Sequence, residues 1–151
     1  MAGVFTQEDV GASLFAYWAD QFPLAVSTVY PGTRVNTAAL DEWIELWIDA
    51  WSRKPQRITS RQLIEVSLSA HIFVKQGTDK SRVHELADAA RVTLSQQTVA
   101  VRDYEESGAP VVGYAKLFET EARDLTRNNL TSLQHSMQHL LVSCRGIAQE
   151  V

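Results

Sequence analysis

The chain is poor in cysteine, with Cys144 as the single example among 151 residues, so no disulfide can form within it. Disulfides are rare where thiols stay reduced, and this composition favours synthesis in the cytoplasm. Residues 1–10 contain neither a basic segment nor a long apolar run, so we expect no signal peptide. No run of about 18 consecutive apolar residues is present, and we therefore expect no membrane-spanning segment.

Positive charge is also scarce. The chain has 14 Lys and Arg against 18 Asp and Glu, which makes a net charge of −4. A protein that binds nucleic acid tightly without sequence preference is usually basic, so the balance argues against that role. The apolar share of 45% and the charged share of 21% are ordinary for a globular fold. The length predicts one domain over residues 1–151.

Recognised catalytic motifs are absent. Gly108 and Gly113 belong to neither a dinucleotide-binding motif nor a phosphate-binding loop. His135 and His139 have a spacing that suits zinc on a helix but leaves them ~13 Å apart on a strand, and surface positions are the preferred interpretation. Cys144 needs a nearby base to act as a nucleophile, and a buried apolar role is favoured for it. We predict no metal and no cofactor.

Carboxylates gather in two groups, each beside a predicted turn. Paired carboxylates perform acid–base chemistry when burial separates their pKa values. Turn positions are solvated, so the sequence favours simple surface charge. The groups are Asp103, Glu105 and Glu106, then Glu119, Glu121 and Asp124.

Two helices are predicted by apolar side chains that recur at helical spacing. Thr6 is a suitable N-cap for a first helix that ends near Asp20. A second helix is expected over residues 80–95, where apolar residues form one stripe.

Strands are predicted by alternation and by β-branched residues. Residues 62–75 alternate without a miss, and so long a strand favours an antiparallel partner. Residues 42–51 fit either a helix or a strand, and we interpret them as that partner, joined through an exposed basic loop over 52–60. The tail, 133–147, remains open between strand and helix. Further strands are expected over 24–30, 98–104 and 111–119, followed by a polar stretch over 120–132.

The order of elements predicts an α+β fold. The economical arrangement is one mostly antiparallel sheet with two main helices packed on one face, in a single domain. The sheet edges of such a domain must be paired or covered.

Tryptophan recurs at every fourth position between residues 43 and 51. This spacing predicts one shared face on either a strand or a helix, and a subunit interface and the core are equally favoured for it. The basic loop that follows is expected to be solvated or to contact another protein. The candidate interface residues are Trp43, Trp47, Trp51, Arg53, Lys54 and Arg57.

The order of these segments resembles the tail terminator proteins of long-tailed bacteriophages, the lambda-like tail-completion family. The resemblance is carried by FPLAV after the first helix, by DEWIELWIDAW and LIEVSLSAHIFVK, by the helix SRVHELADAARVTL, and by VAVRDY and PVVGYAKLFE before RDLTR. It covers most of the chain.

The resemblance implies a virion protein that is made in the host cytoplasm and assembles into a hexameric ring. Such a ring caps the head-proximal end of the tail tube, ends tube growth and provides the surface for joining the head. Its partners are the tail tube protein, the head–tail connector protein and passing DNA that is not bound specifically. No cofactor and no enzymatic activity are implied.

Such a ring also needs a channel through which DNA passes without being bound. An acidic lining repels phosphate, and the expected contributors are the carboxylates near turns, Glu105, Glu106, Glu119 and Glu121. Two alternatives stay open. One is another ring-forming connector or tube protein, and the other is a small α+β enzyme with His71 or Asp103 as its base.

Overall fold

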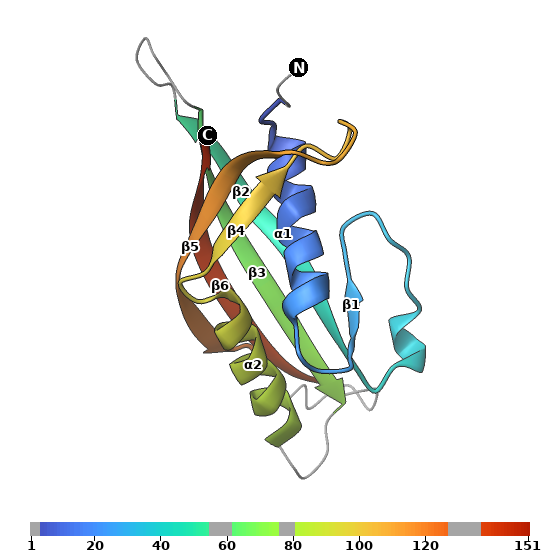
Figure 1. Cartoon of the computed structure of the whole chain (residues 1–151). Helices are drawn as coiled ribbons and strands as arrows, with labels where there is room; N and C mark the ends of the chain where they lie inside the picture. The colour runs from blue at the N-terminus through green and yellow to red at the C-terminus, as the bar shows by residue number, and fades with distance from the viewer. Residues whose placement is uncertain (1–3, 55–61, 76–80, 127–136) are drawn as a thin grey trace.

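A computed structural model describes residues 4–54, 62–75, 81–126 and 137–151 (Figure 1). Over these residues the chain forms one six-stranded sheet, with α1 and α2 on the same side of it. The α+β fold class predicted from the sequence is confirmed. The elements are α1 Gln7–Gln21, β1 Ser27–Val29, a short 3-10 helix Thr37–Ala39, β2 Glu42–Lys54, β3 Leu63–Lys75, α2 Ser81–Leu94, β4 Thr98–Arg102, β5 Val111–Asp124 and β6 Met137–Glu150.

The strands lie in the order β1-β2-β3-β6-β5-β4. Only β1 and β2 run parallel, and every other neighbouring pair is antiparallel. The predicted hairpin of 42–51 with 62–75 is confirmed as β2 and β3. The tail that the sequence left open is strand β6, which lies in the middle of the sheet between β3 and β5. The last strand of the chain therefore joins the two hairpins into one sheet.

Helix α1 begins where the sequence predicts. The Thr6 hydroxyl accepts a hydrogen bond from the Asp9 backbone N–H at 3.1 Å, which satisfies a donor that the first turn leaves free. Val10, Leu14 and Trp18 are buried against the sheet, as their spacing of about one helical turn requires. Beyond the helix the ring of Phe22 stacks on Trp18 with centroids 4.5 Å apart.

Helix α2 packs over β3, β5 and β6. Its predicted apolar stripe is buried, with Leu86 and Ala90 completely inaccessible to solvent. At its first turn Arg82 donates two hydrogen bonds of 2.8 Å to the carboxylate of Glu42 on β2. This bidentate ion pair ties the start of the helix to β2.

Strand β2 contains a bulge between Ile48 and Ala50. Before the bulge, Trp43 and Trp47 alternate with core residues and face away from the helices. A bulge adds one residue to a strand and reverses the alternation beyond it. Trp51 consequently faces α1, with its ring about 3.5 Å from where a Cβ on Gly11 would lie. The prediction that all three tryptophans share one face is therefore wrong for Trp51.

Strand β5 also runs further than predicted, to Asp124, through a register shift between Leu117 and Thr120. Glu119 and Glu121 thus lie within a strand, and the expectation that they stand beside a turn is wrong. The first residues of the predicted 52–60 loop belong to β2, which ends at Lys54. The rest of that loop, and residues 133–136, lie outside the described residues.

Candidate functional site: the open face of the sheet

The side of the sheet opposite α1 and α2 is called the open face here, because no described helix packs on it (Figure 1). It is formed by alternate residues of β2, β3, β6 and β5. The register aligns these residues in rows that cross the strands. Three large apolar side chains on it are strongly exposed: Trp47 at 38%, Phe118 at 43% and Tyr114 at 49%.

One end of the open face has an aromatic row, formed by Trp43, Phe73 and His139 with His71 beside them. Trp43 pairs with Phe73, and Phe73 pairs with His139, so the three side chains stand in line across three strands. The ring centroids are 5.0 Å apart for Trp43 and Phe73 and 4.3 Å apart for Phe73 and His139. Glu45 lies next to the aromatic row, with a carboxylate oxygen 3.4 Å from the Nε1 atom of Trp43.

Two histidines meet within this row. His71 Nδ1 and His139 Nε2 are 2.9 Å apart, so one nitrogen donates a hydrogen bond and the other accepts it. Burial, followed by the charge of His71, lowers the pKa of His139. His139 lies on a strand, so the helical zinc pair with His135 does not form, and His135 is outside the described residues. No group of three metal-binding side chains occurs in the part of the chain that the structure describes.

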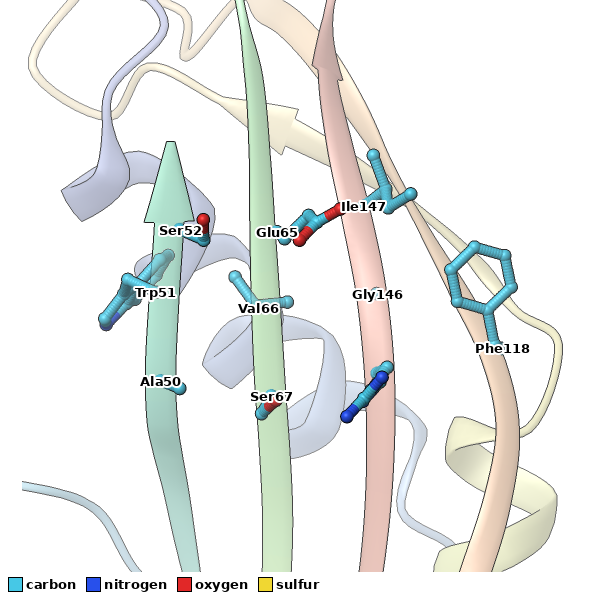
Figure 2. Close-up of a pocket in the computed structure, with 10 residues that line it drawn as sticks. Ala50, Trp51, Ser52, Glu65, Val66, Ser67, Phe118, Gly146 and Ile147 are labelled. Carbon is cyan, nitrogen blue, oxygen red and sulfur yellow. The ribbon is translucent and has the colours of Figure 1, made fainter. Parts of the chain in front are cut away.

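The other end of the open face is depressed into two adjoining recesses of ≈ 450 and ≈ 600 Å³, called the hollow here. Figure 2 shows the first of them. In Figure 2, labelled residues of β2, β3, β6 and β5 lie side by side across this recess, with the helices behind the sheet. Ser67, Phe118 and Arg145 line both recesses. The other charged side chains among the described residues that line the hollow are carboxylates, namely Asp49, Glu65, Glu119 and Glu121.

Cys144 is buried on the helix side of the sheet. Its Sγ lies 3.3 Å from the carbonyl oxygen of Phe118, and burial raises the pKa of the thiol to about 11. A thiol of this kind is protonated at neutral pH and is a poor nucleophile. The apolar role favoured from the sequence agrees with this position.

Asp103 is 6% exposed, so the expectation of a solvated carboxylate is wrong for this residue. Its oxygens accept hydrogen bonds from the backbone N–H groups of Val4, Glu105 and Glu106. These bonds stabilise the charged form and lower the pKa of the carboxyl group. A carboxylate held in this way binds the turn to the N-terminal segment and is a weak base.

The predicted interface residues are divided by the fold. Trp43 and Trp47 belong to the open face, whereas Trp51 packs toward the helices. Arg53 is exposed near the end of β2, Lys54 is its last residue, and Arg57 lies outside the described residues. Sequence reasoning did not single out Phe73, Phe118 or Arg145, and it considered His139 only as a zinc ligand or a surface residue. The alternation of 62–75 placed Phe73 on this side, but the others needed the strand assignment of β6 and the register of β5.

The predicted channel carboxylates are also divided. Glu105 and Glu106 lie in the turn between β4 and β5, beside Glu8 and Asp9 of α1. Glu119 and Glu121 lie in the hollow on the open face. The four residues therefore belong to two separate acidic surfaces.

None of the described helices is long and apolar enough to cross a membrane. Comparison of the chain with models of known protein families and with curated protein sequences finds no match.

Proposed function

We propose that this chain is a structural subunit that assembles with copies of itself into a closed ring, and that the ring is the tail terminator of a long-tailed bacteriophage. The observation that carries the proposal is the exposure of large apolar side chains on the open face. An antiparallel sheet with one face on its own core normally presents polar residues on the other. Trp47 and Phe118 depart from that pattern, and aromatic residues are enriched where proteins contact each other.

The sheet edges support the same proposal. β1 pairs with β2 only along Trp43–Glu45, and β4, at the opposite edge, has five residues. Edge strands with free backbone groups accept a strand or loop from another chain unless they are covered. A ring of identical subunits covers such edges without any additional component.

The more specific role is supported by the resemblance in the order of the elements. In that role the ring sits at the head-proximal end of the virion tail. One of its surfaces covers the last layer of tail tube protein and ends tube growth, and the other joins the head–tail connector protein. The work consists of binding alone, so an aromatic face and charged surfaces are sufficient.

The enzyme alternative has weaker support. His71 is engaged with His139, and the oxygens of Asp103 are occupied by backbone N–H groups. Asp103 lines a pocket beside α1, but its lowered pKa makes it a weak base.

Native mass spectrometry and sedimentation of the purified protein test the ring. We expect a cyclic oligomer, six subunits in the favoured form. Trp47→Ser removes an exposed aromatic ring from the open face and is expected to shift the protein toward monomer. Tyr104→Ser is the matched control, because Tyr104 is 48% exposed but lies in the turn after β4. A wild-type protein that is monomeric at every concentration contradicts the proposal.

A further inference from the structure

The hollow on the open face has an unbalanced charge. Among the described residues that line its two recesses, Arg145 is the one basic side chain, whereas Asp49, Glu119 and Glu121 are acidic; Glu65 also lines the hollow and has an interaction partner of its own. Within the described residues, neither Asp49 nor Glu121 forms a salt bridge. Phe118 and Ile147 add apolar surface beside these charges. Such a surface suits a partner that presents basic groups on long apolar stems.

The same chain contains a segment of that chemistry. Residues 53–61 read RKPQRITSR, with four basic side chains and no acidic one. The segment connects two long strands that are still paired at Lys54 and Leu63. This connecting segment is called the basic tip here.

Copies of this chain repel each other on average, because each has a net charge of −4. A contact between copies is favoured where an acidic surface of one meets a basic surface of the other. The hollow and the basic tip are such a pair. They are different surfaces, so each copy can give its tip to one neighbour and receive a tip from another, which is the head-to-tail contact that closes rings.

A second acidic surface exists beside Glu8, Asp9, Glu105 and Glu106. None of the described residues that line it is aromatic, although Tyr104 is exposed in the same turn, and the surface lies at the N-terminal end of α1 rather than on the open face. The hollow is therefore the better match for arginine, which stacks on aromatic rings as well as pairing with carboxylates.

We infer that the hollow is the docking site for the basic tip of a second copy of this chain. Arg53 and its neighbours pair with Asp49 and Glu121 of the next subunit, and their stems pack on Phe118. The inference rests on the proposed ring and names the contact that holds neighbouring subunits together.

Charge reversal tests the contact. The hollow variant is Asp49→Lys with Glu121→Lys, and the tip variant is Arg53→Glu with Arg57→Glu. Each is expected to weaken assembly at least about tenfold in sedimentation, the scale of losing close charge pairs at an interface. The control is Glu105→Lys with Glu106→Lys, which makes the same charge change as the hollow variant on the other acidic surface. Circular dichroism and the melting temperature verify that all three variants are folded.

Mixing provides the decisive measurement. In an equimolar mixture of the hollow and tip variants, each reversed tip meets a reversed hollow and each native tip meets a native hollow. We therefore expect the mixture to regain the wild-type oligomer, as should a single chain with all four substitutions. Wild-type assembly should also weaken as ionic strength rises from about 0.1 M to about 1 M, where the screening length falls from ~10 Å to ~3 Å.

The possible failures are distinguishable. A wild-type monomer overturns both the ring and this contact. A wild-type ring that survives both charge reversals leaves the ring standing and overturns the docking of the tip. The docking is also overturned if the mixture stays dissociated, or if the tip variant keeps its ring and loses only binding to duplex DNA.

Discussion

His71 Nδ1 and His139 Nε2 lie 2.9 Å apart although 68 residues separate them in the chain. They are diagonal neighbours on β3 and β6, since His71 is opposite Leu141 and His139 is opposite Phe73. The bond between them needs one neutral acceptor nitrogen. Acid therefore removes this contact from the aromatic row.

The stability of the protein should decrease as pH falls below the ordinary histidine value of 6.5. The pKa of His139 is lowered in the fold by burial and then by His71, while Glu45 and Asp124 oppose the shift. The unfolded chain thus binds the proton first, so this contribution is complete above 6.5 and is lost as pH falls through the lowered pKa. Urea unfolding at several pH values measures it. His139→Gln should flatten the dependence, whereas His84→Gln, at an exposed helix position, should leave it unchanged.

Two glycines should respond in opposite directions to alanine. A Cβ on Gly113 would lie 2.5 Å from the carbonyl oxygen of Gln149 and 2.7 Å from the ring of Phe5. Gly113→Ala should therefore cost about 1–3 kcal/mol of unfolding free energy. Gly11, in the interior of α1, has only ordinary contacts of 3.5 Å around its missing Cβ. Gly11→Ala should stabilise the protein by up to ~1 kcal/mol. Chemical denaturation of both variants tests the pair, and an equal effect contradicts the packing at Gly113.

Trp51 and Trp47 should have different roles although the sequence presents them alike. Trp51 packs against the core beside α1, so Trp51→Ala should cost roughly 2–4 kcal/mol of stability. Trp47→Ala should cost roughly 1 kcal/mol or less, because the ring is largely on the open face. Denaturant unfolding of the two variants measures both values under conditions that keep the protein monomeric. Similar losses at both positions contradict the bulge in β2.

Asp103 should stabilise the fold by accepting hydrogen bonds from backbone N–H groups. Asp103→Ala removes the acceptor for three backbone N–H groups and should lower the melting temperature. Asp103→Asn keeps the oxygen that accepts hydrogen bonds from Glu105 and Glu106 but loses the oxygen that accepts one from Val4. The melting temperature of this variant should therefore lie between those of the wild type and the alanine variant. Glu105→Ala, at an exposed neighbour, is the control. An alanine variant as stable as wild type contradicts the role.

The lowered pKa of Asp103 argues against a role as a catalytic base, because a carboxylate that stays charged at low pH accepts protons poorly. Its contribution to stability is present above the ordinary carboxyl value of 3.8 and is lost as pH falls through the lowered pKa. Acid unfolding below that value should therefore be less steep in Asp103→Ala than in the wild type. An unchanged acid profile counts against the hydrogen bonds at this turn.

The sequence by itself determined the elements whose signals are local. The N-cap at Thr6, the apolar stripe of α2 and the alternation of β3 each depend on residues within a few turns or steps of one another. The hairpin of β2 and β3 also followed, because an alternating strand of this length needs a partner. These signals were sufficient for the fold class and for placing two helices on one face.

Only the tertiary structure decided which side chains share the open face. The bulge that turns Trp51 inward depends on how β2 pairs with β3, and nothing in the local spacing indicates it. The tail 133–147 gave no clear period, and it becomes a strand because β3 and β5 each leave an edge for β6 to fill. That insertion brings His139 to His71 and Arg145 into the hollow. Contacts between strands distant in the chain follow from register, and register is a property of the assembled sheet.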